Sequence, residues 1–288
     1  MPPSIAISDL DGARTVRELI RDWRACVQAA PQVRVARALY QGRSIVDADT
    51  ATRHLGANLY IVSAGLGLVS AEQEVDGYDC TVAPSSNLAK RLTSEGLQPA
   101  YWWEQLTARD PFPLSNLLRR ASGYIAMPAT YLRLVHDDLA RLSKADAGGL
   151  RIFTSPAGAN EVPKHLGNNV LPYDERLESI SSHAGTQADF PQRAMRHFVE
   201  HLAAPALTLE EARAAVATAL APWNRRQQPL RIRLTDEEIC SHLRAQWTRH
   251  AGSSTRLLRF LRDEALVSCE QKRFSRLWQR LQAELEKT

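Results

Sequence analysis

The segment LYIVSAGLGLV, residues 59–69, is the longest apolar run in the chain and decides its fold class. Its first half holds β-branched residues, and its second half holds Gly65 and Gly67. A continuous apolar run of this kind predicts a strand buried on both faces, and the glycines predict a tight turn at its end. The run has eleven residues, so it is too short to cross a bilayer.

The same pattern recurs along the chain. VRVARALY, YIAMPA and LRIFTSP predict strands over 33–40, 124–129 and 150–156. Other segments have the spacing of amphipathic helices, over 16–30, 130–145 and 189–204. Buried strands that alternate with helices predict an α/β fold, a three-layer domain with a mostly parallel central sheet. Ligands bind such domains beyond the carboxyl ends of the strands.

The C-terminal part of the chain has a different pattern. PWNRRQQP (222–229) is typical of a linker, and LRIRL (230–234) predicts a short strand after it. Short helices are predicted on both sides of this segment, over 208–220, 235–250, 255–264 and 270–285. We therefore expect an α/β domain over 1–221 and a small, mainly helical domain over 222–288, similar to a winged helix or helix-turn-helix.

Charge separates the same two parts. The 288 residues carry a formal net charge of +4, and their 44% hydrophobic and 24% charged content excludes wholesale disorder. Residues 225–288 hold 14 Lys/Arg and 8 Asp/Glu, whereas the rest of the chain holds 22 and 24. A basic C-terminal domain indicates a polyanionic partner such as double-stranded DNA. The alternative is a solvated basic helix face.

The cysteines and the N-terminus indicate the compartment. The four cysteines are far apart, with no CxxC pair and no Cys/His spacing typical of zinc, as expected for free thiols. The N-terminal residues MPPSIAISDL lack the pattern of a secretory signal. We expect a cytoplasmic protein with no bound metal and no membrane partner.

The C-terminal helices offer candidate contacts to a DNA duplex. Arg256 and Arg259 recur on one predicted helix, and hydroxyl side chains precede them. Hydroxyls bind phosphates, and arginines add charge or reach base edges. The expected DNA contacts are Ser253, Ser254, Thr255, Arg256, Arg259, Lys272 and Arg273, together with Arg193 on the helix predicted over 189–204. The alternative is that the arginines form ion pairs with Asp263, Glu264 and Glu270.

Three short motifs follow one another within residues 36–82. They are LYQGRS (39–44), YIVSAGLGLV (60–69) and YDCTV (78–82). Their order resembles a bacterial family of α/β domains that is distantly similar to the uracil-DNA glycosylase superfamily. Members of that family include anti-phage DNA glycosylases, which remove glucosylated hydroxymethylcytosine from phage DNA. The resemblance covers roughly residues 30–200.

This resemblance implies a hydrolase without a cofactor. It would flip a modified base out of foreign double-stranded DNA and excise it, leaving an abasic site as an antiviral defence. The GQDPYH-like motif of uracil-DNA glycosylases is absent from the sequence. The water-activating carboxylate therefore cannot be transferred from those enzymes. Two alternatives stay open, a DNA-binding protein without catalysis and a base or nucleotide transferase.

Cleavage of an N-glycosidic bond requires negative charge near C1′, a positioned water and a pocket for the flipped base. Asp79 is the first candidate for activating water, Asp76 is the next, and Glu161 in a later loop is a rival. His165 is a candidate for stabilising the leaving base or binding a phosphate, and is otherwise a surface histidine. The candidate substrate-binding residues are Tyr40, Arg43, Ser63, Gly65, Gly67, Tyr78, Ser155 and Asn168. Taken singly, the aromatic, glycine and aspartate residues also fit ordinary core and turn roles.

Overall fold

A computed structural model gives the fold of the chain. It describes residues 5–10, 12–31, 33–110, 113–120, 123–203, 207–224 and 231–285. The chain divides into two compact units, residues 1–226 and 227–288, which are treated separately below. From residue 225 onward, the linker predicted over 222–229 lies outside the described residues. This division leaves Arg225 and Arg226 in the first unit, so the second holds 12 basic against 8 acidic residues.

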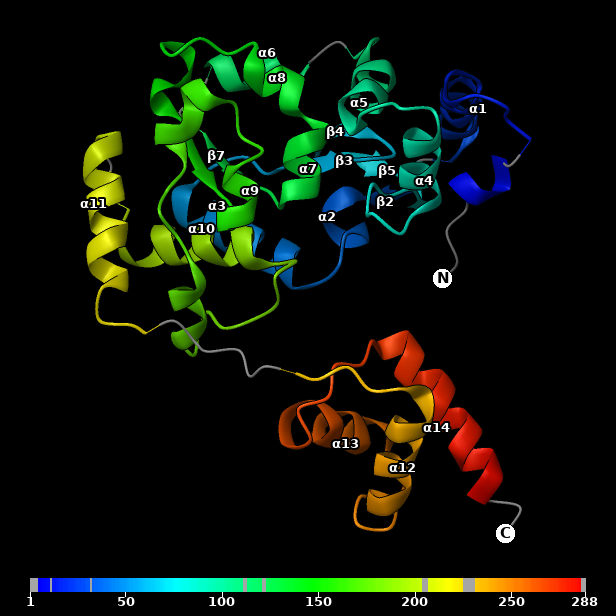
Figure 1. Cartoon of the computed structure of the whole chain (residues 1–288). Coiled ribbons are helices and arrows are strands. Elements are labelled where there is room, and N and C mark those ends of the chain that lie inside the picture. The colour runs from blue at the N-terminus through cyan, green and yellow to red at the C-terminus, as the bar shows by residue number, and fades with distance from the viewer. Residues whose placement is uncertain are drawn as a thin grey trace. The chain divides into compact units, whose positions relative to one another are not determined.

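The first unit mixes helices with short strands that pair two by two (Figure 1). Two pairs are parallel: β1 (Ile5–Ala6) with β6 (Tyr78–Asp79), and β7 (Tyr124–Ala126) with β8 (Arg151–Phe153). Two are antiparallel: β2 (Arg34–Val35) with β5 (Glu74–Val75), and β3 (Tyr60–Ser63) with β4 (Gly67–Ser70). The first unit therefore combines helices with strands, and it contains both parallel and antiparallel strand pairs.

The apolar run at 59–69 forms a hairpin: the predicted strand and the tight turn at its glycines are present, and the residues after the turn return as a second strand. Strand β3 turns back through Ala64–Leu66 into β4, with Ser63 opposite Gly67. Two tryptophan rings hold the turn: Trp23 Nε1 donates to the Gly65 carbonyl and Trp102 Nε1 to the Ala64 carbonyl, both at 2.7 Å. Gly67 has a φ of +79°, which favours glycine. The glycines thus fold the apolar run back on itself.

Helices make up most of the first unit. The α-helices are α1 (Val16–Ala29), α2 (Ala36–Leu39), α3 (Arg43–Leu55), α4 (Asn87–Ser94), α5 (Pro99–Thr107), α6 (Leu114–Arg120), α7 (Ala129–Leu134), α8 (His136–Ala140), α9 (Pro156–Ala159), α10 (Phe190–His201) and α11 (Leu209–Leu220). Shorter 3-10 turns are η1 (Ile7–Leu10), η2 (Asp146–Gly149), η3 (Lys164–Asn169) and η4 (Glu175–Ser179). Among the described residues, no helix combines the length and the apolar character needed to cross a membrane.

Local signals explain several helix boundaries. Thr15 and Glu18 form a capping box at the start of α1, and Thr208 and Glu211 form another at the start of α11. The helix predicted over 130–145 is broken at Val135 into α7 and α8. The strand predicted over 33–40 is limited to β2, and its remaining residues form α2 and the turn after it.

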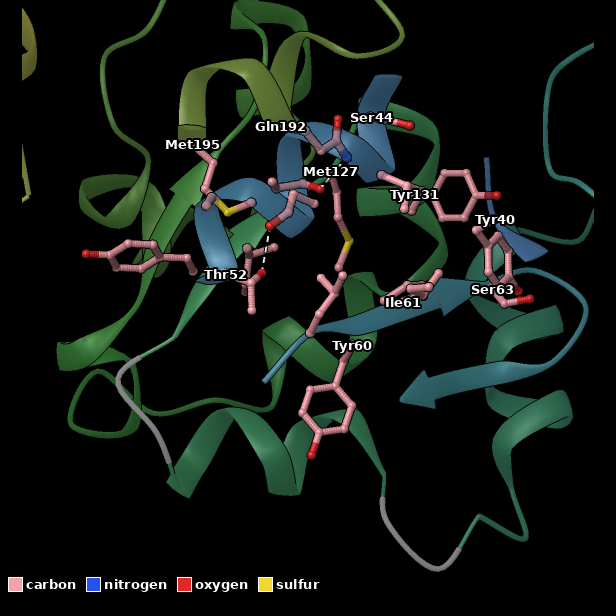
Figure 2. Close-up of a pocket in the computed structure, with 18 of the residues that line it drawn as sticks. Tyr40, Ser44, Thr52, Tyr60, Ile61, Ser63, Met127, Tyr131, Gln192 and Met195 are labelled. Carbon is pink, nitrogen blue, oxygen red and sulfur yellow. Dashed lines mark hydrogen bonds between the residues drawn. The ribbon is translucent and has the colours of Figure 1, made fainter. Parts of the chain in front are cut away.

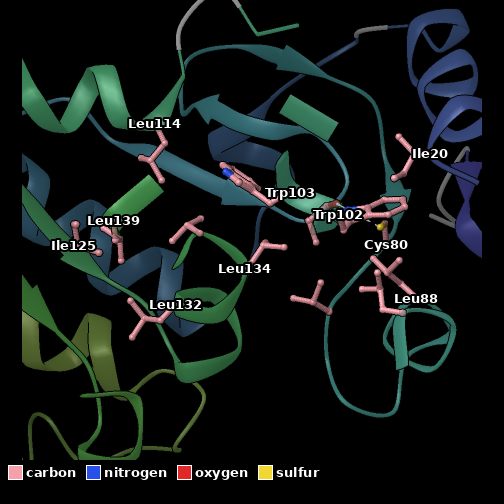
Figure 3. Close-up of a cluster of buried hydrophobic side chains, with 14 of the residues drawn as sticks. Ile20, Cys80, Leu88, Trp102, Trp103, Leu114, Ile125, Leu132, Leu134 and Leu139 are labelled. Carbon is pink, nitrogen blue, oxygen red and sulfur yellow. Dashed lines mark hydrogen bonds between the residues drawn. The ribbon is translucent and has the colours of Figure 1, made fainter. Parts of the chain in front are cut away.

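Two large apolar cores and a smaller cluster of Ala36, Ile61, Val69 and Val75 hold the first unit together. In one, shown in Figure 3, the indole of Trp102 lies beside Cys80 and the side chains of α1 and α4. Trp103 in the same core is almost fully buried, and its indole N–H donates to Asp138 at 2.7 Å. The other core packs α10 against β8 and α11, with Phe153 and Phe198 at its centre.

A buried arginine organises the segment that precedes α10. The side chain of Arg193 is fully buried. Its guanidinium donates to Asp189 and Glu178, each at 2.7 Å, and to the Thr186 carbonyl at 2.6 Å. It also donates to the carbonyl of His183. The prediction that Arg193 contacts DNA is therefore wrong, because its donors are taken up inside the fold.

The second unit is a small helical cluster. It contains α12 (Asp236–Gln246), α13 (Ser254–Arg259), a π-helical turn (Phe260–Glu264) and α14 (Gln271–Leu285). The strand predicted over 230–234 is reduced to one bridge, between Ile232 and Val267, and Leu230 lies outside the described residues.

Stacked indoles fix the turn between α12 and α13. The rings of Trp247 and Trp278 stack with their centroids 6.2 Å apart. The Trp278 indole N–H donates to the Gly252 carbonyl at 2.9 Å. Gly252 has a φ of +66°, and a Cβ there would lie 3.1 Å from the Trp247 ring. Glycine is therefore required at this turn.

Replacing Arg193 tests its role as an internal clamp. We expect Arg193→Met to lower the free energy of unfolding of the first unit by about 3–5 kcal/mol, because it leaves two mostly buried carboxylates without their cation. Arg21 is the control, since its side chain is 73% exposed and its ion pair with Asp22 lies at the surface. Arg21→Met should leave stability nearly unchanged, as surface substitutions usually do. Urea unfolding followed by tryptophan fluorescence measures the free energy of unfolding of both variants. Equal losses of stability would show that Arg193 does not hold the segment before α10.

Candidate functional site

The first unit contains a large cavity between α3, α10 and the strands β3 and β7. Its volume is about 940 Å³, near the upper end of the range of about 300–1,000 Å³ that is usual for ligand sites. Figure 2 shows Tyr40, Ser63 and Tyr131 gathered at one end and Met195 and Thr52 at the other. The cavity is therefore long enough to present different chemistry at its two ends.

The part of the cavity wall that the structure describes carries no charge. None of the wall residues that the structure describes is an Asp, Glu, Lys, Arg or His. Its polar groups are hydroxyls and amides, from Tyr40, Gln41, Ser44, Thr52, Asn58, Tyr60, Ser63, Tyr78, Tyr124, Tyr131 and Gln192. Burying an unpaired charge against such a wall is costly, so the site favours a neutral ligand.

Three hydroxyls form a chain at one end of the cavity. The Tyr78 hydroxyl lies 2.5 Å from Ser63 Oγ and 2.5 Å from the Tyr40 hydroxyl. Ser63 Oγ also accepts the backbone N–H groups of Gly65 and Leu66, at 3.2 and 3.0 Å. Those two bonds occupy both acceptor positions of the oxygen, so Ser63 donates to Tyr78, and Tyr78 in turn donates to Tyr40. The hydroxyl hydrogen of Tyr40 is then left for an acceptor in the cavity.

Burial keeps these phenols neutral. It raises the pKa of Tyr40 above its ordinary value of 10. Burial also raises the pKa of Tyr78, and the neighbouring Tyr40 raises it further. Both tyrosines therefore act at neutral pH as hydrogen-bond donors and acceptors, not as bases.

Gln192 brings an unused acceptor to the same cavity. Its side-chain nitrogen donates to the Ala126 carbonyl at 2.9 Å, which fixes the orientation of the amide. The amide oxygen is buried and has no hydrogen-bond partner among the described residues. A buried oxygen of this kind is normally satisfied. Because almost none of its surface is accessible, the Gln192 side chain would have to move slightly before this oxygen could accept from a ligand in the cavity.

The two aspartates predicted to activate water lie outside the cavity wall. Tyr78 and Asp79 are consecutive in β6, so their side chains point to opposite faces of the strand. Tyr78 lines the cavity, and Asp79 is exposed. Asp76 accepts the N–H of Gly77 at 2.8 Å in the turn before β6. Asp79 is therefore not placed to activate water at this cavity.

Candidate residues from later in the sequence lie apart from the large cavity. Glu161 pairs with Arg133 at 2.7 Å, and the hydrogen bond from that arginine lowers the pKa of the carboxyl. His165 Nε2 lies 2.8 Å from the Leu142 carbonyl. His165 and Asn168 line a second pocket of about 290 Å³, apart from the large cavity. The structure thus does not bring Glu161 or His165 to the hydroxyl chain.

The other candidate substrate-binding residues have structural contacts. Arg43 donates to the Ala184 carbonyl at 2.6 Å, outside the cavity wall. Gly65 and Gly67 shape the hairpin turn, and neither lines the cavity. Ser155 caps α9 by accepting the Gly158 N–H at 3.1 Å. Of the predicted set, Tyr40, Ser63 and Tyr78 are the residues that meet at the cavity.

In the second unit, the predicted DNA contacts divide into paired and free groups. Arg273 pairs with Asp236 at 2.6 Å and donates to the Leu234 carbonyl, so it is paired, but with an acid that the ion-pair alternative did not name. Arg256, Arg259 and Lys272 are exposed and have no partner among the described residues.

The hydroxyl residues beside these arginines are also accessible. Ser253 occupies the N-cap position of α13 without a side-chain cap bond, and Ser254 and Thr255 follow it. Arg249, in the turn before α13, is a further exposed arginine without a described partner, and sequence reasoning missed it.

Sequence reasoning also missed several wall residues. Gln192 lies on a helix that was predicted, but nothing in the sequence distinguishes it from a surface glutamine. Helix α3 contributes Ser44 and Thr52 to the wall. The sequence pattern does not predict a helix over residues 43–55. Tyr131 was placed in a helix without a role. Burial of polar side chains, which only the structure gives, is the signal that singles out these residues.

Gly65 offers a test of the packing at the hydroxyl chain. A Cβ at Gly65 would lie 2.7 Å from the Tyr78 ring and 3.0 Å from Trp23. We expect Gly65→Ala to destabilise the first unit by about 1–3 kcal/mol, because both rings are held by hydrogen bonds. The control is Gly148→Ala, where nothing lies within 4 Å of the added carbon. Thermal unfolding compares them, and a neutral Gly65→Ala would contradict the packing described.

Comparisons with known proteins give no family for this chain. No protein-family model matches it, and neither a curated protein nor a solved structure matches it.

Proposed function

We propose that this protein is a DNA glycosylase that receives one extruded base of a DNA duplex in the neutral cavity of its first unit. The observation that carries the proposal is the pairing of a free donor with a free acceptor on an uncharged wall. Tyr40 offers its hydroxyl hydrogen, and Gln192 offers an amide oxygen that has no described partner.

A nucleobase suits this combination. Bases are neutral and planar, and their edges carry both N–H donors and carbonyl or ring-nitrogen acceptors. Tyrosine rings on the wall provide surfaces on which a base can stack. The volume of about 940 Å³ leaves room for a bulky substituent on the base, such as a sugar. These properties support a modified pyrimidine of foreign DNA as the substrate.

The second unit supplies the contact to duplex DNA in this proposal. Among the described residues, its exposed cations without a partner are Arg233, Arg249, Arg256, Arg259 and Lys272. Such groups neutralise phosphates and release counterions, and this release dominates affinity for DNA. Extrusion of a base costs a few kcal/mol of stacking, so it needs binding energy of this kind.

Excision would proceed without a carboxylate on the wall. Cleavage of the N-glycosidic bond leaves a sugar with oxocarbenium character, whose positive charge must be stabilised. The phosphates that flank the extruded nucleoside carry the required negative charge. Neutral hydroxyls and amides can orient the attacking water, and the Tyr40 hydroxyl can donate to an oxygen of the departing base. A cavity wall without carboxylates therefore places the negative charge on the substrate.

A second candidate function is a reader that binds an extruded base and does not excise it. The same absence of charged groups among the described wall residues favours it. This second function differs from the glycosylase in one outcome, since no free base is released. It uses the same cavity and the same DNA-binding unit.

Base release and base capture can be measured separately. Duplexes containing cytosine, uracil or glucosylated hydroxymethylcytosine are incubated with the protein, and abasic sites are then revealed by alkali. A 2-aminopurine beside the modified base reports extrusion by its fluorescence. Excision confirms the glycosylase, and extrusion without abasic sites supports the reader. Neither signal on any duplex would overturn both.

Tyr40→Phe tests the donor on the wall. We expect it to weaken capture or excision of the modified base by about tenfold, because one buried hydrogen bond is worth about 0.5–1.5 kcal/mol. Tyr101→Phe is the control, since Tyr101 is partly buried away from the cavity wall. Binding of unmodified duplex should be the same for both variants. An unchanged Tyr40→Phe would show that the hydroxyl does not contact the base.

Arg256→Ala with Arg259→Ala tests the second unit. We expect the double variant to bind every duplex more weakly and to reduce the slope of log K against log salt by about 2, close to 0.9 for each lost phosphate contact. Arg244→Ala removes an arginine that is paired with Glu284 and should change the slope less. A slope equal to that of the unchanged protein would exclude these two arginines from the DNA contact.

A further inference from the structure

A cluster of histidines lies at the C-terminal end of α10, away from the residues used above. His197, Glu200 and His201 belong to the last turns of that helix. His183 comes from the segment before α10, which Arg193 holds by the His183 carbonyl. The rings of His183 and His201 meet edge to face, and His197 packs against both.

Three ligand atoms of this cluster face one another. His183 Nε2 and His201 Nε2 are 3.4 Å apart, and each lies 3.9 Å from Glu200 Oε2. The centre of a triangle with these sides lies about 2.2 Å from each atom, and zinc binds histidine nitrogen and carboxylate oxygen at about 2.0–2.2 Å. The three atoms are therefore already spaced around a point that suits a metal ion.

Hydrogen bonding alone does not account for this arrangement. A separation of 3.4 Å is long for an N–H···N bond between two imidazoles. The side chain of His183 is 2% exposed, and its Nδ1 is buried without a partner among the described residues. A buried imidazole whose Nε2 has one weak contact is costly, and a metal ion at Nε2 would satisfy that nitrogen. The unpaired Nδ1 lies on the other side of the ring and would keep its hydrogen.

The surroundings orient the carboxylate. Arg196 donates to Glu200 Oε1 at 2.7 Å and to Asp47 at 2.9 Å. This pairing holds one carboxylate oxygen and leaves the other turned to the two histidines. The last turn of a helix also favours positive charge, because its carbonyl groups point beyond the end. Both features favour a cation at this position despite the neighbouring arginine.

We propose that His183, Glu200 and His201 bind a divalent transition-metal ion of the zinc type. Two imidazoles and one carboxylate are a ligand set that such ions prefer, and three protein ligands leave one coordination position open. The side chain of His201 is 55% exposed, so the ion can enter from solvent. The ion would fasten the segment that carries His183 to the end of α10.

The test uses the untagged full-length protein after removal of metal with a chelator. Co²⁺ is titrated into it, since this ion absorbs visible light when it is bound in a low-coordinate site, and Zn²⁺ is then added as a competitor. We expect one Co²⁺ for each chain, displaced by Zn²⁺. His201→Ala and Glu200→Gln should each weaken Co²⁺ binding by more than about 100-fold, since loss of outer-shell partners alone costs about 10–100-fold. His136→Ala, on the exposed face of α8, is the matched control and should bind Co²⁺ normally.

A thermal readout separates ligation from folding. Zn²⁺ should raise the unfolding temperature of the unchanged protein and of His136→Ala, but not of His201→Ala, because a ligand that binds only the folded state stabilises it. Without metal, His201→Ala should fold normally, since its side chain is more than half exposed. The proposal is overturned if the unchanged protein binds no Co²⁺, or if both ligand variants bind it as tightly as the unchanged protein. Neither outcome bears on DNA binding or base release.

Discussion

The buried guanidinium of Arg193 is the interaction on which much of the first unit depends. A charge without solvent must be fully compensated, and Arg193 has two carboxylates and two backbone carbonyls around it. The acceptors all come from the segment between residues 178 and 189, so the single cation determines the path of twelve residues that have little regular structure. Gly185 passes so close that a Cβ there would lie 2.5 Å from the Arg193 Nε. Charge compensation and close packing thus fix the same segment.

Helix α10 carries this clamp together with the residues of two distinct sites. Gln192 faces the cavity, Arg193 faces the clamped segment, and Glu200 and His201 meet His183 at the far end. Because successive residues of a helix point in directions about 100° apart, one rigid element can serve three surroundings at once. The helix is anchored to α3 through the pair of Arg196 with Asp47. The position of the cavity wall and that of the histidine cluster are therefore linked through a single element.

Sequence patterns predicted the helices well where apolar spacing and capping agreed. The starts of α1, α11 and α12 follow their capping boxes, and their apolar periodicity follows the buried faces. The glycines indicated the turn within 59–69, but the return strand β4 was not predicted, because the residues on both sides of the turn are nearly all apolar and show no alternation in sequence. Of the site, the sequence indicated Tyr40, Ser63 and Tyr78, which lie within the motifs of the resemblance. It gave no sign that Asp79 faces away, since only the pairing of β6 sets that direction. The histidine cluster was also missed, because its members are 17 and 18 residues apart and form no spacing pattern.

The absence of charge on the described part of the cavity wall has a consequence for competition inside a cell. Free nucleotides are abundant, but to enter the cavity their phosphates would have to leave water for a wall whose described residues include no cation. A base presented on a polymer keeps its phosphates outside, in solvent. In the proposed function, the described wall thus discriminates against mono- and triphosphates, and leaves uncharged bases and nucleosides as the small molecules able to compete with the base.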